Sequence, residues 1–232
     1  MHKRFLLNVI LLGLCLGCGT GEYESRIGQR KASSTPDVLG PAEELAGTRV
    51  SIRVPRCMTL LPEGTDAKRA KPLMPFQIPG MQQRTYEGFA KDAEESQIPF
   101  YCHVIVVETP KTPGQNLSSQ LQSAMGKLSG NAPQLTDFQA ASPEGKESKW
   151  QMMRLPAAPQ EFYCKDKAGQ ETYKPLNAIG EMYLHEEAGF SIMIAWRLPE
   201  YIEKNVGNTP ENNVGLAQLA KLTAGAVSVK PQ

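Results

Sequence analysis

Apolar residues along the chain from Thr48 onward follow the patterns of a β-sheet. Apolar and polar positions alternate over 48–55, which predicts a half-buried strand. Residues 98–108 are apolar almost without a break, as expected of a central strand that is covered on both faces. Two more apolar runs within 180–198 flank a short turn and predict an antiparallel hairpin. Further strands are predicted at 134–142, 147–155 and 160–165, separated by turn-forming residues at 142–145 and 156–159.

Two segments show the spacing of amphipathic helices. Over 116–129 apolar side chains recur on one helical face, with Asn116 expected to cap the helix and Gly130 to end it. A closing helix is expected after Thr209, Pro210 and Glu211, which offer an N-cap, a proline and an acidic residue in the first turn. The predicted buried stripe of this helix is Leu216, Leu219, Ala220 and Thr223.

Residues 56–97 hold four prolines and are expected to form only short, interrupted structure. Within them, the segment 71–81 concentrates apolar side chains between its prolines. One interpretation is that this segment folds back as a lid on the core. The other is an apolar docking surface for a protein or lipid partner. The residues in question are Leu73, Met74, Phe76, Ile78 and Met81.

These elements together predict an α+β domain over 48–232, in which a mainly antiparallel sheet packs against two main helices. The polar stretch 18–47 is expected to be a flexible, disordered tether. The order of elements over 48–229 is similar to that of the PsbP and Mog1-like group, in which an antiparallel sheet lies between helices. This resemblance implies a role in binding or assembly rather than catalysis, and it assigns no functional residue.

The N-terminus has the features of an export signal. Met1 to Arg4 form a short cationic start, and residues 5–16 are apolar except for Asn8. Twelve helical residues rise about 18 Å, which is too short for the roughly 30 Å hydrocarbon core of a bilayer. Residues 1–17 are therefore predicted to be a cleaved signal peptide.

The end of this signal resembles the lipobox of bacterial lipoproteins. The family usually has Leu, a small residue, and Gly or Ala before the cysteine that receives the lipid, and this chain has Cys15, Leu16, Gly17 and Cys18. The last two positions match, whereas the first two depart from the pattern. The resemblance implies a lipid anchor on Cys18, and Gly19 in place of Asp after it implies sorting to an outer membrane rather than retention at the inner one. Cleavage after Gly21 and retention of the signal as an anchor are the alternatives.

Composition and charge limit the partners of the exported chain. Loss of residues 1–17 leaves 23 of the 25 basic residues against 24 acidic ones, a formal charge of −1. A nucleic-acid partner would require a clustered basic surface and is not expected. A hydrophobic content of 41% fits an ordinary globular core.

Candidate catalytic residues are few. Cys57, Cys102 and Cys164 would enter an oxidising compartment and allow at most one disulfide, with the pairing open. Cys57 follows Arg56 and is the candidate for a reactive thiol, whereas Cys102 and Cys164 are expected to be buried and inert.

The histidines offer little support for a metal or a thiol–imidazole site. His103 follows Cys102, and His185 precedes Glu186 and Glu187, but neighbouring side chains in a strand point to opposite faces. No nucleophile-elbow or phosphate-loop motif occurs in the chain. We therefore expect no metal and no cofactor.

The hypothesis from the sequence is a membrane-anchored envelope lipoprotein that acts as a non-enzymatic binding or assembly module. Its partners would be the membrane, through the lipid on Cys18, and a protein or lipid at the segment with Met74, Phe76, Ile78 and Met81. An envelope enzyme with an unrecognised, possibly thiol-based site is the first alternative. A purely structural envelope component is the second.

Overall fold

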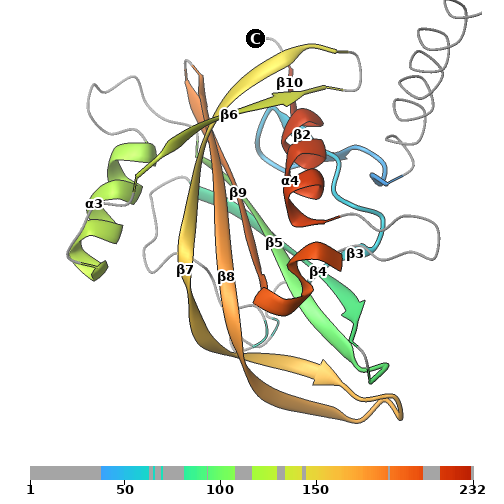
Figure 1. Cartoon of the computed structure of the whole chain (residues 1–232). Coiled ribbons are helices and arrows are strands. Elements are labelled where there is room, and N and C mark those ends of the chain that lie inside the picture. Colours follow the sequence, from blue (N-terminus) through green and yellow to red (C-terminus); the bar gives the residue numbers. More distant parts are fainter. Residues whose placement is uncertain are drawn as a thin grey trace, which may run out of the picture. The chain divides into compact units, whose positions relative to one another are not determined.

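A seven-stranded antiparallel sheet forms the body of the protein, shown as a computed structural model in Figure 1. The structure describes residues 38–62, 65, 69, 81–92, 94–107, 117–129, 134–142, 145–187, 189–205 and 215–230. The strands lie in the order β3-β4-β5-β9-β8-β7-β6. Their bounds are β3 (Met58–Leu60), β4 (Met81–Lys91), β5 (Gln97–Val107), β6 (Thr136–Ala141), β7 (Glu147–Lys165), β8 (Glu171–Glu187) and β9 (Phe190–Pro199).

The centre of this sheet is buried on both faces. All residues of β5 after Gln97 are buried, as are all residues of β9. β4 pairs with one edge of β5 from Met81 to Lys91, and β9 pairs with the other edge. The predictions of a central strand at 98–108 and of a hairpin within 180–198 are confirmed. The prediction of only short structure over 56–97 is wrong for β4, whose polar residues form a strand because β5 satisfies its backbone along the whole length.

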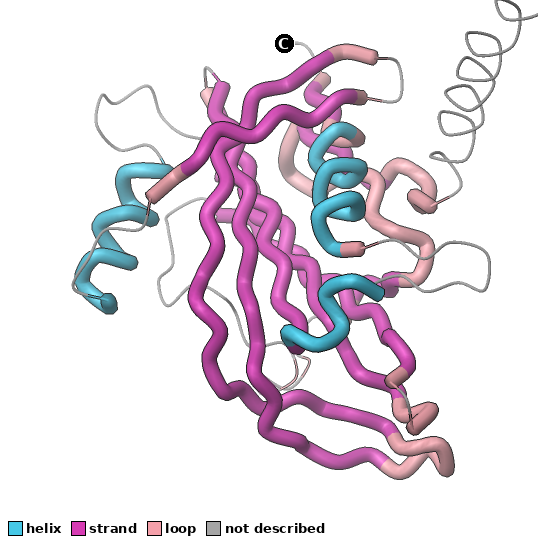
Figure 2. The backbone as a smooth tube through the Cα atoms, in the orientation of Figure 1, coloured by secondary structure: helices cyan, strands magenta, loops and turns pink. Residues whose placement is uncertain are grey.

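β7 and β8 extend beyond the end of β9 as a two-stranded arm. β9 ends at Pro199 opposite Ala178, so the part of β8 before Ala178 pairs only with β7. The pairing of β7 and β8 shifts between Leu155 and Ala158, where the strands bend, as Figure 2 shows. At the end of the arm, the last residue of β7, Lys165, pairs with the first residue of β5, Gln97.

In the part of the chain that the structure describes, two α-helices and one 3₁₀ helix accompany the sheet. They are α3 (Leu117–Ser129), η2 (Glu200–Asn205) and α4 (Leu216–Gly225). Leu117 and Leu121 of α3 pack against buried side chains of β5, β7, β8 and β9, as expected for the predicted helix at 116–129. The predicted buried stripe of α4 is confirmed. Asn116, Gly130 and the residues 209–211 lie outside the described part of the chain.

A small second sheet joins the two ends of the described chain. It consists of β1 (Glu43–Glu44), β2 (Val50–Ile52) and β10 (Ser228–Val229). Leu39 and Leu45 are buried. Packed structure therefore begins nine residues before Thr48, the residue at which the folded domain was expected to start. Leu39–Gln232 form one compact unit.

The predicted α+β class is wrong, because the fold is mainly β. β7 and β8 span 19 and 17 residues, whereas α3 and α4 span only 13 and 10. Residues 156–159 were expected to turn but continue β7, where the bend and a free edge accommodate Pro156 and Pro159. No strand was expected at 171–179, which lengthens β8. Among the described residues, no helix has the length and apolar character needed to cross a bilayer.

Candidate functional site

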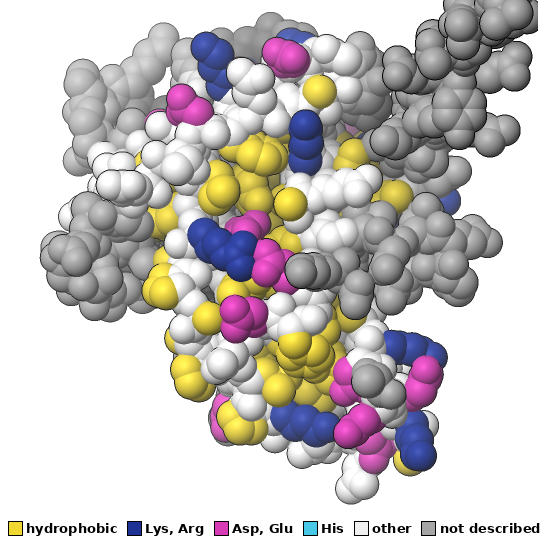
Figure 3. All heavy atoms as spheres, in the orientation of Figure 1, with side chains coloured by type: hydrophobic (Ala, Val, Ile, Leu, Met, Phe, Trp, Pro, Cys, Tyr) yellow, Lys and Arg dark blue, Asp and Glu magenta, His cyan; other side chains and the backbone are white. Residues whose placement is uncertain are grey.

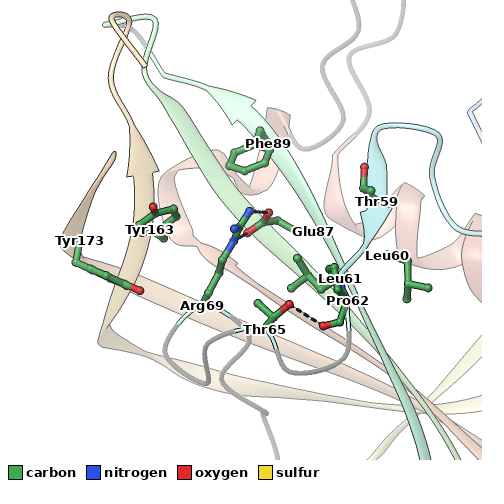
Figure 4. Close-up of a pocket in the computed structure, with 10 residues that line it drawn as sticks. All are labelled: Thr59, Leu60, Leu61, Pro62, Thr65, Arg69, Glu87, Phe89, Tyr163 and Tyr173. Carbon is green, nitrogen blue, oxygen red and sulfur yellow. Dashed lines mark hydrogen bonds and ion pairs between the residues drawn. The ribbon is translucent and has the colours of Figure 1, made fainter. Parts of the chain in front are cut away.

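A groove of about 650 Å³ lies between β3, β4 and the β7–β8 arm. Figure 4 shows its side chains, with Arg69 and Glu87 between the tyrosines of the arm and the residues around β3. Its volume is within the range of small-molecule sites. We call it the Arg69–Glu87 groove, and it is lined by Thr59, Leu60, Leu61, Pro62, Thr65, Arg69, Glu87, Phe89, Tyr163 and Tyr173.

The two charged residues of the groove form a bidentate pair. Arg69 Nε donates to Glu87 Oε1 at 3.0 Å, and Arg69 Nη2 donates to Glu87 Oε2 at 2.5 Å. Glu87 is only 4% exposed, whereas the side chain of Arg69 is 31% exposed. The hydrogen bonds that Arg69 donates to Glu87 raise the pKa of Arg69 above its usual value. The buried carboxylate is therefore held in place by a partly exposed guanidinium.

A row of polar residues on adjacent strands supports this pair. Glu87 on β4 lies opposite Tyr101 on β5, and Tyr101 lies opposite Arg197 on β9. The Arg197 guanidinium is centred 4.4 Å from the Tyr101 ring and 5.3 Å from the Phe162 ring. Arg197 Nη2 also donates to the backbone oxygen of Arg69 at 3.2 Å. Arg69 is thus fixed by its side chain to Glu87 and by its backbone to Arg197.

Aromatic rings form the side of the groove that belongs to the arm. Tyr163 and Tyr173 are paired across β7 and β8, with ring centroids 5.1 Å apart and planes tilted by 54°. The Arg69 guanidinium lies 5.4 Å from the centre of the Tyr163 ring. Lys165 Nζ lies 5.6 Å from the centre of the Phe89 ring. The groove therefore combines flat apolar ring faces with one internally paired set of charges.

A second hollow of about 760 Å³ lies between the small sheet, the end of α4 and the strands β7 and β8. In its lining, the rings of Trp150 and His185 are 5.0 Å apart. His185 Nδ1 donates to the backbone oxygen of Lys149 at 2.7 Å, and His185 Nε2 lies 3.1 Å from Glu187 Oε1. Both ring nitrogens of His185 are thus engaged by the protein itself. The Arg69–Glu87 groove is the stronger candidate because it holds a buried carboxylate.

A cluster of charged side chains outside the two hollows connects η2 to the sheet. Arg154 of β7 forms ion pairs with Glu203 of η2 at 2.7 Å and with Glu181 of β8 at 3.0 Å. The Tyr183 hydroxyl donates to Glu181 at 2.6 Å. On the face that carries α4 and η2, basic and acidic side chains gather side by side among hydrophobic ones (Figure 3). These pairs join secondary-structure elements and line neither hollow.

Comparison with known proteins finds similarity only in overall outline. No family model and no curated protein matches the chain. Similar solved structures include the Ran-binding protein Mog1p of Saccharomyces cerevisiae, with 14% identity, a TM-score of 0.39, and coverage of 82% of this chain and 94% of that one. PsbP (CyanoP) of Synechocystis sp. PCC 6803 has 9% identity, a TM-score of 0.40, and coverage of 84% and 94%.

A structure from Bacteroides thetaiotaomicron is also similar, with 9% identity and a TM-score of 0.36. The match covers 79% of this chain but only 46% of that one. The solved structures to which the chain is similar thus include a Mog1 protein and a PsbP protein. At these scores no conclusion about function rests on any of these structures.

The predicted docking segment contributes one residue to the described structure. Met81 begins β4 and packs, partly buried, against the core cluster near α3. It does not line the Arg69–Glu87 groove. Met74, Phe76 and Ile78 lie outside the described residues, as does Cys18. The docking surface at that segment stays a prediction.

The cysteines do not offer an activated thiol. Cys57, Cys102 and Cys164 are unpaired, with Cys57 half-buried and the other two buried. Burial raises the pKa of the Cys57 thiol above its usual value, whereas a thiol nucleophile requires a lowered pKa. The structure therefore gives no support to Cys57 as a nucleophile.

The structure does not bring either histidine together with all of the residues that were considered as its partners in a metal or thiol–imidazole site. His103 is buried in β5, and its Nδ1 is 3.0 Å from Thr85 Oγ1. Glu186 accepts a hydrogen bond from the backbone of Ser118 rather than facing His185. In the part of the chain that the structure describes, no group of three His, Cys, Asp or Glu side chains could hold a metal ion.

The groove was not predicted, because its residues are separated along the chain. Arg69 and Glu87 are 18 residues apart, and both lie in a region expected to be irregular. Tyr163 and Tyr173 meet only because β7 and β8 pair as a long arm. The one available signal was the position of Glu87 within Tyr86-Glu87-Gly88-Phe89, where a carboxylate stands among residues suited to a core.

Proposed function

We propose that the protein is a membrane-anchored binding module of the cell envelope, without catalytic activity of its own, and that its ligand occupies the Arg69–Glu87 groove. The observation that supports this most is the bidentate pair at the centre of an aromatic-sided groove. A general acid or base must be free to exchange a proton with a substrate. Here both carboxylate oxygens of Glu87 accept hydrogen bonds from Arg69, an arrangement that suits recognition better than proton transfer.

The anchor is part of the same proposal. The signal-like residues 1–17 and the resemblance of Cys15 to Cys18 to a lipobox support a lipid on Cys18, with the outer membrane as the favoured destination. The residues between Cys18 and Leu39 would then separate the folded unit from the membrane surface. A module of this kind presents its groove to molecules of the envelope.

Photo-crosslinking in cells tests whether the groove binds a ligand. A photoreactive amino acid would replace Leu60, which lines the groove and is 41% exposed. The matched control is the same replacement at Tyr201, which is 53% exposed and lies outside the groove lining. We expect a defined adduct from position 60, detected as a mass shift, and none from position 201. If position 60 yields no more adduct than position 201, the groove is not a binding site.

A further inference from the structure

The charges in the Arg69–Glu87 groove indicate the charge of its ligand. Among the lining residues that the structure describes, Arg69 and Glu87 are the charged ones, and they neutralise each other in a bidentate pair. A charged ligand would have to displace one partner and leave the other without its counter-ion in a partly buried site. The groove is therefore suited to a ligand without net charge.

The aromatic side chains indicate the shape of that ligand. Tyr163 and Tyr173 meet at 54°, and Phe89 projects from β4 in the same groove, so flat apolar surfaces lie beside the Arg69–Glu87 pair (Figure 4). A guanidinium has five N–H donors, and Arg69 uses two of its nitrogens toward Glu87. Carboxylate lone pairs and threonine hydroxyls add acceptors. The groove thus offers ring faces together with adjacent donors and acceptors.

We propose that the Arg69–Glu87 groove binds a neutral saccharide. This proposal rests on the proposed binding function and names its ligand class. A pyranose presents an apolar C–H face, which stacks on a tyrosine or phenylalanine ring. Its hydroxyl groups both donate and accept hydrogen bonds, which matches the remaining N–H donors of Arg69 and the hydroxyl groups of Thr59 and Thr65. A volume of about 650 Å³ accommodates a short oligosaccharide segment.

Other ligand classes fit the groove less well. An acyl chain would cover the exposed part of the Arg69 guanidinium without replacing its hydrogen bonds to water. A peptide that binds by strand addition needs a long free edge. The adjacent edge strand β3 has only three residues, and the free edge of β8 carries Lys174 and Pro175, which oppose strand addition.

Saturation-transfer NMR on the full-length protein in detergent micelles tests this proposal. The neutral probes are chitotetraose, cellotetraose and maltotetraose, and the comparison probes are a glucuronate-containing tetrasaccharide, palmitate and a capped apolar hexapeptide. We expect at least one neutral saccharide to bind, with transfer strongest at its ring C–H protons. Tyr173→Ala and Tyr163→Ala should each weaken this binding by on the order of tenfold, since each removes one stacking surface. Tyr201→Ala, which removes an exposed tyrosine outside the groove lining, should leave it unchanged.

Three outcomes would overturn the proposal: no neutral saccharide binds, a comparison probe binds in preference, or saccharide binding is unaffected by both groove variants. Crosslinking at Leu60 shows whether only the saccharide proposal is wrong or whether the groove binds no ligand at all. An adduct at Leu60 without saccharide binding leaves a binding module with another ligand, such as a peptide. No adduct and no saccharide binding would reject both.

Discussion

Gly225→Ala should destabilise the protein by about 3 kcal/mol or more, at the upper end of the range for overpacked sites. Gly225 is the last residue of α4 and packs against the end of β6. A Cβ atom at this position would lie 2.1 Å from the backbone oxygen of Ala141 and 2.7 Å from its carbonyl carbon. Neither atom can move as a flexible side chain can, so helix and strand must separate. Thermal unfolding should show a decrease in the melting temperature of roughly 6–12 °C.

Gly169→Ala is the matched control for this variant. Gly169 lies in the turn between β7 and β8 with φ of +81°, and a Cβ atom there would meet nothing within 4 Å. The change should cost only about 1 kcal/mol, from the left-handed backbone conformation. If Gly225→Ala is no more destabilising than Gly169→Ala, the close packing of α4 on β6 is not as described.

Stability should fall steeply in acid because His103 is buried in its neutral form. Burial, with a smaller contribution from the positive charge of Arg197, lowers the pKa of His103 to about 3. The unfolded chain, with a histidine pKa of about 6.5, takes up the proton first as the pH falls. The contribution of neutral His103 is therefore complete above about pH 6.5 and is lost toward pH 3, at roughly 1.4 kcal/mol per pH unit. Denaturant unfolding at a series of pH values measures this slope.

The variant His103→Gln isolates this contribution from the carboxylates that also titrate in acid. Glutamine does not titrate, and it can keep a hydrogen bond to Thr85, the present partner of His103 Nδ1. Between pH 6 and pH 4 the unfolding free energy of the variant should decrease less steeply than that of the wild-type protein. The difference between the two slopes should be roughly 1.4 kcal/mol per pH unit. Equal slopes for the two proteins would show that His103 is not buried and neutral in the folded state.

The sequence predicts those elements whose burial pattern is local. β5 is an almost continuous apolar run that is buried on both faces, and the hairpin of β8 and β9 has two apolar runs about a turn, so the hydrophobic pattern alone was sufficient. The stripe of Leu216, Leu219 and Ala220 on α4 was predicted for the same reason. These segments acquire their structure from their own sequence and from simple burial.

The arm and the groove depend on pairing between distant residues, which periodicity does not show. Pro156 and Pro159 indicate a turn in isolation, but strand pairing with β8 carries the chain past them. β4 is too polar to stand out as a strand, yet it pairs with β5 over eleven residues. These long strands made the fold mainly β and brought Tyr163, Tyr173 and Glu87 into one groove.

Intact-mass spectrometry of the membrane-extracted protein tests directly whether a lipid on Cys18 holds this binding module on a membrane. We expect a mature chain that begins at Cys18 and carries the mass of a diacylglyceryl group, with or without a further acyl chain. Cys18→Ala should abolish the added mass and release the protein from the membrane fraction. A chain that begins after Gly21, or one that retains residues 1–17 without added lipid, would show that Cys18 does not carry a lipid anchor.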